Sequence, residues 1–221
     1  SGGGSIPTGA VTLAWFENVP LVSYLVIGGR CRSCGSRISA RYPVVEGLTG
    51  LMFASAAWYY GPSVLLASRV WLGCSLIALF AIDLEHHLLP NVITLPGIVV
   101  GFAFSWLTSP GWTSSALGIV VGGGTLYAIA EGYYRLRHEE GLGMGDVKML
   151  AMVGAFLGWP LTLVTLVMAS LAGSVVGIFV LATRRGDMKS ALPFGTFLAL
   201  GATLAGTVGP GLLDWYLGFW W

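Results

Sequence analysis

The sequence predicts an all-α fold, a polytopic bundle of about seven helices that crosses a lipid bilayer repeatedly. Of its 221 residues, 55% are hydrophobic and only 10% are charged, whereas charged residues make up about a quarter of a typical soluble domain. Several apolar runs approach the ~20 residues that a membrane helix needs. The 33 glycines favour closely packed helices over loops. These observations argue against a disordered chain and against a water-soluble enzyme fold.

The apolar runs, taken in order, predict seven crossings. They cover residues 43–60, 64–82, 91–108, 114–134, 147–159, 160–183 and 192–213. Glycine and proline mark boundaries between them, at Gly61-Pro62, Leu89-Pro90-Asn91, Ser109-Pro110-Gly111 and Trp159-Pro160. The run 147–159 is short, because at about 1.5 Å per residue it reaches only about 20 Å of a core about 30 Å thick. One continuous helix over 147–182 would be about 54 Å long, so we expect two crossings there.

The basic residues predict the orientation of these crossings. Ten of the eleven Lys and Arg residues fall on one side of the predicted topology, and only Arg69 does not. By the positive-inside rule that side is the cytoplasm, so we expect residues 6–42 to form a cytoplasmic loop subdomain and residues 43–221 a membrane domain. Residues 1–5 have the composition of a flexible linker, which we interpret as an appended segment. The bilayer is an expected partner, and nucleic acid is not.

Two groups of acidic residues lie at the predicted cytoplasmic ends of membrane segments. Asp83 ends an apolar run and is followed by Glu85, His86 and His87. Asp146 closes the sequence Gly143-Met144-Gly145-Asp146 and begins the next apolar run, with Lys148 two residues further on. The two aspartates therefore share a depth. An ionisable group at the margin of a bilayer is a functional-site hypothesis by default.

Two aspartates at one depth suggest a specific chemistry. Carboxylates that approach within a few ångströms cannot both ionise, so they share a proton and together polarise a water while donating to a carbonyl oxygen. This is peptide hydrolysis without a metal or a covalent intermediate. Gly143 and Gly145 would let a backbone pass close to a substrate. The alternative is that each aspartate is a solvated helix-end residue, with Asp146 favouring a helix N-terminus.

Several motifs together resemble the bacterial type IV prepilin peptidases, aspartic intramembrane proteases of the GxGD class. In the membrane part the motifs are Ile82-Asp83-Leu84-Glu85 with Leu89-Pro90-Asn91, then Gly143-Met144-Gly145-Asp146-Val147-Lys148, and finally Pro193-Phe194-Gly195. In the first loop they are residues 15–25, Gly29-Arg30-Cys31-Arg32-Ser33-Cys34 and residues 38–43. The resemblance extends from about residue 13 to the C-terminus, and the motifs occur in the family's order.

The resemblance implies that Asp83 and Asp146 are the catalytic pair of a peptidase in the bacterial inner membrane. It implies cleavage of the basic leader of prepilins or pseudopilins on the cytoplasmic side, with no cofactor for the proteolysis. Longer family members also methylate the new N-terminus with S-adenosylmethionine. The family has eight membrane helices, one more than we predict here. Glu85, Gly143, Gly145 and Lys148 are expected to bind substrate or support the pair, although Lys148 is equally explained as a snorkelling residue of a basic loop.

Cys31 and Cys34 form a single CxxC pair in the loop. The family's loop commonly carries two such pairs, which together make a tetrathiolate zinc site. A structural zinc ordinarily has four ligands, so the two thiolates here need partners such as Glu17, a histidine or a second chain. We therefore expect any zinc at Cys31 and Cys34 to be structural.

Two other classes of function compete with the peptidase. A proton-coupled transporter would also use membrane carboxylates, but such sites usually lie near the midplane between repeated halves, and no repeat is apparent in this sequence. A structural subunit of a pilus or secretion assembly would leave both aspartates dispensable. The sequence does not specify the pilin substrate or the oligomeric state.

Overall fold

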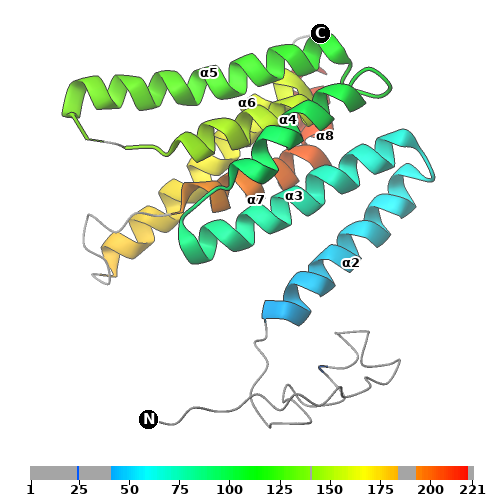
Figure 1. The fold of residues 1–221 in the computed structure, drawn as a ribbon, viewed down its shortest axis with the longest axis horizontal. Coiled ribbons are helices and arrows are strands. Elements are labelled where there is room, and N and C mark those ends of the chain that lie inside the picture. Colours follow the sequence, from blue (N-terminus) through cyan, green and yellow to red (C-terminus); the bar gives the residue numbers. More distant parts are fainter. Residues whose placement is uncertain (1–23, 25–40, 140, 184–192, 219–221) are drawn as a thin grey trace. The chain divides into compact units, whose positions relative to one another are not determined.

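The computed structural model describes residues 24, 41–139, 141–183 and 193–218, and the regular structure within them is helical. The chain divides into two compact units, Ser1–Leu51 and Met52–Trp221, and the packing and the site described below belong to the second. With the labels of Figure 1, the helices are α2 (Arg41–Tyr60), α3 (Val64–His86), α4 (Asn91–Phe104), α5 (Trp112–Arg137), α6 (Met144–Ala182), α7 (Phe194–Thr207) and α8 (Gly209–Gly218).

The boundaries of α3 follow from local chemistry. Its N-cap is Ser63, whose hydroxyl accepts a hydrogen bond from the Leu66 N–H (3.2 Å), as serine N-caps commonly do. Its C-cap is His87 in the left-handed conformation (φ 51°), whose N–H donates to the Asp83 carbonyl (2.9 Å). The predicted breaks at Gly61-Pro62, Leu89-Pro90 and Pro110-Gly111 all fall between helices, which confirms those boundaries.

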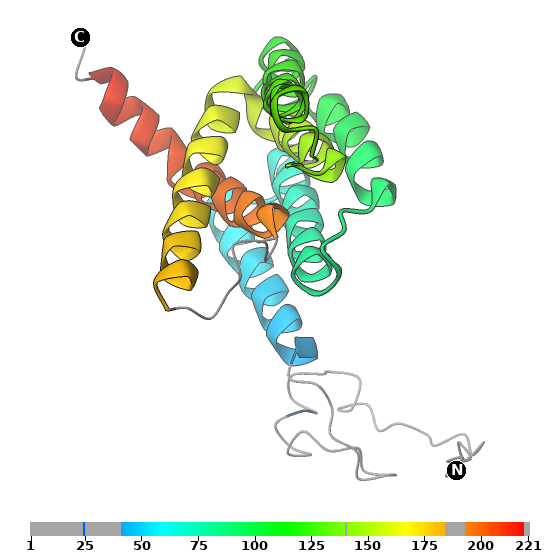
Figure 2. The same ribbon diagram turned by 90° about the vertical axis from the view of Figure 1, so that its left-hand side faces the viewer.

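Helix α6 is broken at Gly158, which has φ 78° and ψ 168°. The break lies one residue before the predicted one at Trp159-Pro160, and Figure 2 shows the chain changing direction there. Every residue from 149 to 158 is buried. A helix that is apolar all round belongs in the middle of a bundle, and the first half of α6 is that central helix. This half of α6 corresponds to the predicted run 147–159, the shortest of the seven, and it is enclosed by the other helices.

Two side chains from neighbouring helices cap the carbonyls that the break in α6 exposes. Pro160 has no N–H, so it cannot bond the Phe156 carbonyl four residues earlier. Arg69 of α3 donates its Nη1–H to that carbonyl instead (3.2 Å). Ser115 of α5 donates its hydroxyl to the Ala155 carbonyl (2.7 Å) at a buried position. Arg69 is the one basic residue that the predicted topology places opposite the other ten. It has a hydrogen-bond partner within the bundle.

Glycines allow α5 and the first half of α6 to lie backbone against backbone. A Cβ added to Gly122 would sit 2.7 Å from the Leu150 carbonyl oxygen, and one added to Gly118 would collide with the Gly154 backbone. Any larger side chain would push the helices apart. This close approach confirms the use of glycine for helix packing that the composition indicated.

The predicted crossing over 192–213 contains two helices instead of one. Helices α7 and α8 are bent by 63° relative to one another. Pro210 explains the bend, since it cannot donate to the Gly206 carbonyl and disfavours helical geometry at Gly209 before it. Among the described residues, three helices are long and apolar enough to span a membrane, or four if this bent pair counts as one span. The chain is thus a helical membrane protein, and its seven crossings stay a prediction.

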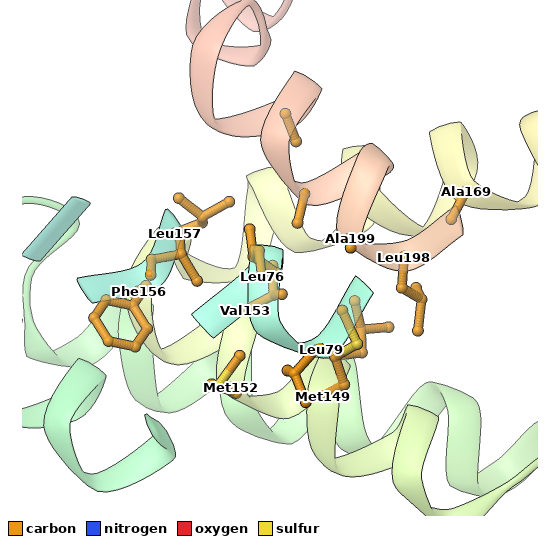
Figure 3. Close-up of a cluster of buried hydrophobic side chains, with 14 of the residues drawn as sticks. Leu76, Leu79, Met149, Met152, Val153, Phe156, Leu157, Ala169, Leu198 and Ala199 are labelled. Carbon is orange, nitrogen blue, oxygen red and sulfur yellow. The ribbon is translucent and has the colours of Figure 1, made fainter. Parts of the chain in front are cut away.

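The core lies where α3, α6 and α7 meet. Figure 2 shows α7 between α3 and the second half of α6, and it packs on both. Buried side chains from the three helices form one cluster, which Figure 3 shows with Leu76 and Leu79 from α3, Met149, Met152, Val153, Phe156, Leu157 and Ala169 from α6, and Leu198 and Ala199 from α7. This apolar cluster fixes the relative positions of the helix ends that carry Asp83 and Asp146.

Candidate active site

Asp83 lies on the buried face of α3. The buried residues of this helix include Leu72, Leu76, Leu79 and Asp83, and spacings of three and four residues place them along one side of a helix. Asp83 therefore continues the stripe that packs in the core, and only 4% of it is exposed. Burying a carboxylate costs free energy unless it has hydrogen-bond partners. The groups that donate hydrogen bonds to Asp83 are therefore part of the site.

The N-terminus of α7 supplies those partners. The Asp83 Oδ2 atom accepts hydrogen bonds from the backbone N–H of Thr196 (2.7 Å) and from its hydroxyl (3.0 Å). The first N–H groups of a helix have no partner within the helix and carry partial positive charge. A carboxylate placed there is both satisfied and fixed in orientation. The two bonds join residues 113 positions apart in the chain.

Asp146 stands in the first turn of α6 and is 8% exposed. Its backbone N–H donates to the Gly143 carbonyl (3.1 Å), and its carboxylate interacts in turn with the Gly143 backbone. This arrangement resembles the return half of a capping box, in which an acidic third residue bonds back to the helix start. It holds the Asp146 side chain against the loop that precedes α6.

Leu89 joins the two aspartate segments. A Cβ on Gly195 would lie 2.9 Å from both Asp83 Oδ2 and Leu89 Cδ1, and a Cβ on Gly145 would lie 2.8 Å from Leu89 Cβ. Both contacts are tighter than real side chains allow. Glycine at these two positions therefore lets the start of α7 and the start of α6 close on the same leucine.

The two aspartates lie on neighbouring segments, because Leu89 contacts both Gly195, beside Asp83 Oδ2, and Gly145, the residue before Asp146. The fold thus brings together two acidic residues that are 63 positions apart in the sequence. Both are almost fully buried. Two carboxylates that approach each other in such surroundings repel one another when both are charged.

The other expected site residues lie in different places. Gly143 and Gly145 belong to the turn before Asp146. Lys148 donates its ammonium group to Asn91 Oδ1 (2.9 Å), which links α6 to the start of α4. Glu85 is exposed, two residues beyond Asp83 on α3. Cys31 and Cys34 lie outside the described residues.

Thr196 is a partner of the site that the sequence did not single out. It follows directly on Pro193-Phe194-Gly195, which we noted only as a motif. A hydroxyl residue just after a proline that precedes a helix can supply both a backbone and a side-chain donor. That pattern could have marked Thr196. Nothing local could have indicated that the acceptor would be Asp83.

Comparisons with known proteins agree in assigning a family. Residues 70–178 match the type IV leader peptidase family, and residues 5–60 match the bacterial peptidase A24 N-terminal domain. Three similar proteins are each named prepilin leader peptidase/N-methyltransferase. The one from Pseudomonas putida is 39% identical over 87% of this chain and 67% of its own length. Those from Pseudomonas aeruginosa and Aeromonas hydrophila are 36% and 37% identical, over 92% and 91% of this chain and 71% and 70% of their own. No solved structure matches the chain.

Proposed function

The chain belongs to the type IV leader peptidase family, and we propose that it is an aspartic endopeptidase of the bacterial inner membrane that removes the leader peptide from prepilins or pseudopilins. One observation carries the assignment of the site. Asp83 and Asp146, from separate helices, are both buried, and Leu89 contacts the segment beside each of them. A transporter or a structural subunit has no comparable support from the relatives, whose printed names describe a peptidase.

The proposed reaction is general acid–base hydrolysis by the shared-proton pair. One carboxylate takes a proton from a water molecule as the water oxygen attacks the scissile carbonyl carbon. The other carboxyl group donates its proton to the carbonyl oxygen, which gives a neutral gem-diol. The C–N bond then breaks as a proton passes to the leaving nitrogen, and the products are a carboxylic acid and an amine.

Thr196 restricts how Asp83 takes part in this reaction. The backbone N–H of Thr196 can only donate, so Asp83 Oδ2 is held as an acceptor. The proton that the pair shares therefore moves between Asp83 Oδ1 and Asp146. Thr196 does not touch the substrate in this scheme. It is a positioning residue that holds the Asp83 carboxylate in one orientation.

The charges at the helix ends support the proposed cytoplasmic placement of the site. The aspartates lie near the C-terminus of α3 and the N-terminus of α6, and Arg135 and Arg137 lie at the adjoining C-terminus of α5. Basic residues at membrane-helix ends favour the cytoplasm. A substrate with its apolar stem in the bilayer and its leader outside would present the bond between them at this depth.

Methylation of the new N-terminus, which the relatives' names include, is proposed as a second activity and would use S-adenosylmethionine. A cavity beside the Asp146 loop has a volume of about 230 Å³, below the ~300–1,000 Å³ of typical small-molecule pockets. It does not fit that methyl donor, so no step is assigned to it. Among the described residues, no group of three or more His, Cys, Asp or Glu could hold a metal. Cys31 and Cys34 alone supply half of a structural zinc's four ligands.

Conservative replacement of each aspartate tests the proposal. Asp83→Asn and Asp146→Asn keep the shape but remove the acid–base function, so each should lower the rate of leader cleavage by at least about 10²–10⁴-fold. The measurement is cleavage of a purified pilin-like substrate in detergent or vesicles. Asp214→Asn makes the same change at an exposed position on α8, so it is the matched control and should cleave normally. Cleavage by Asp146→Asn at the rate of the control would remove that residue from the mechanism.

A further inference from the structure

A cavity lies beside the loop that carries Asp146. It is lined on one side by Tyr127, Ala130, Glu131 and Tyr134 of α5 and on the other by residues that include Leu142 and Met144. The four α5 residues follow one another at spacings of three, one and three, so they share a face of the helix. Gly143 lies between the lining residues Leu142 and Met144, and a Cβ on Gly143 would lie 3.4 Å from Asp146 Oδ2. The cavity therefore borders the loop against which the Asp146 carboxylate packs, between α5 and α6 in Figure 1.

The lining of this cavity is suited to a positive charge. Glu131 places a carboxylate in the wall, and Tyr127 and Tyr134 are about half exposed, at 51% and 50%. Aromatic faces next to a carboxylate attract ammonium and guanidinium groups. Glu131 Oε1 already accepts a hydrogen bond from Arg135 Nε (2.8 Å). The structure thus contains one example of a guanidinium bound by this carboxylate.

The size of the cavity limits what it can hold. Its volume of about 230 Å³ is below the ~300–1,000 Å³ of pockets for drug-sized ligands and cofactors. A single side chain fits this space better than a whole cofactor does. An extended peptide advances about 3.3 Å per residue, so a chain with its scissile bond at Asp146 would bring a side chain only a few residues away to the cavity.

We propose that this cavity, which we call the Glu131 subsite, binds a lysine or arginine side chain of the peptide substrate on the leader side of the scissile bond. The side of the bond follows from the membrane. A charged side chain is costly within the hydrocarbon core, so the stem of the substrate cannot supply it and the leader can. The inference rests on the proposed peptidase function and adds a residue that selects the substrate.

Paired variants of one ion pair test the subsite. Glu131→Gln removes the carboxylate, and Arg135→Gln breaks the same Glu131–Arg135 bond but leaves the carboxylate in place. The pair is partly exposed, with side-chain exposures of 37% for Glu131 and 76% for Arg135, so neither change should prevent folding. If the pair only stabilises α5, the two variants will behave alike. If Glu131 binds substrate, they will differ.

The measurement is KM and kcat for two pilin-like substrates that differ in one leader residue, lysine or alanine, near the cleavage site. Glu131→Gln should raise KM for the lysine substrate about fivefold, the size of one exposed charge pair, and leave KM for the alanine substrate and both kcat values unchanged. Arg135→Gln should keep or improve the preference for lysine. Equal KM changes on both substrates, or no change on either, would overturn the subsite.

A further pair of substitutions keeps the test independent of the peptidase proposal. Glu131→Lys should prefer a glutamate in place of the leader lysine, reversing the selectivity of the unmodified protein. The unmodified protein and Asp146→Asn are assayed on the same substrates. If the unmodified protein cleaves them and Asp146→Asn does not, the peptidase stands whatever Glu131 does. If neither cleaves, the proposed function fails first.

Discussion

At the residue scale, the site depends on the absence of a side chain at Gly195 as much as on the carboxylate of Asp83. A single methyl group on Gly195 would reach Asp83 Oδ2 and Leu89 at 2.9 Å. The start of α7 would then have to move away, and the Thr196 donors would move with it. The position of one glycine thus decides whether the carboxylate has its partners.

The hydroxyl of Thr196 gives the residue-scale prediction. Thr196→Val keeps the shape and the backbone N–H but removes one of the two donors to Asp83 Oδ2. A hydrogen bond to a carboxylate contributes about 1.5–3 kcal/mol, so kcat for leader cleavage should fall about tenfold or more while KM changes little. Thr196→Ser retains the donor and should restore the rate. Equal kcat values for the valine and serine variants would show that the hydroxyl does not position Asp83.

The sequence predicts the chemical role of some site residues and not of others. Asp83 and Asp146 stood out because ionisable groups at the margins of apolar runs are costly. Thr196 did not stand out, because threonine is unremarkable until its acceptor is known. Lys148 was open between a substrate contact and a snorkelling role, and its bond to Asn91 favours a link between α6 and α4.

At the element scale, the break in α6 depends on side chains from two other helices. Arg69→Met should lower the free energy of unfolding by about 1–3 kcal/mol, because the Phe156 carbonyl would lose its donor at a site with no amide to replace it. The measurement is reversible unfolding in mixed detergent micelles. Arg135→Met, which breaks an exposed pair, is the control and should change stability by less than about 1 kcal/mol. A loss no larger than that of the control would mean that Arg69 does not support the break.

Helix boundaries were predictable where proline and glycine act locally. The breaks near residues 61, 89, 110 and 158 follow from backbone restrictions that any sequence imposes. The bend between α7 and α8 follows the same rule at Pro210. It was missed because the apolar run continues through the proline, and hydrophobicity alone does not distinguish a straight span from a bent one.

At the scale of the whole molecule, the sequence alone could not predict that the ends of α3 and α6 come together. The run lengths and basic residues placed Asp83 and Asp146 at one depth, but a bundle has many positions around its circumference at that depth. The packing of α7 against α3 and α6, with its glycines and the core of Figure 3, decides which positions meet. The contacts of α7 with α3 join segments more than a hundred residues apart, and no local pattern specifies them.

Proximity of the two aspartate positions is the central claim, and cross-linking measures it most directly. In a background of Cys31→Ser, Cys34→Ser and Cys74→Ser, the pair Asp83→Cys with Asp146→Cys is treated with a short bifunctional thiol reagent and the joined peptides are identified by mass spectrometry. The control pair is Trp106→Cys with Asp146→Cys, since Trp106 is exposed and follows Phe104, which packs on Phe156, ten residues along α6 from Asp146. We predict a cross-link in the first pair and none in the control. Two thiols in the first pair that each react with a monofunctional reagent, yet never become joined, would contradict a shared acid–base site.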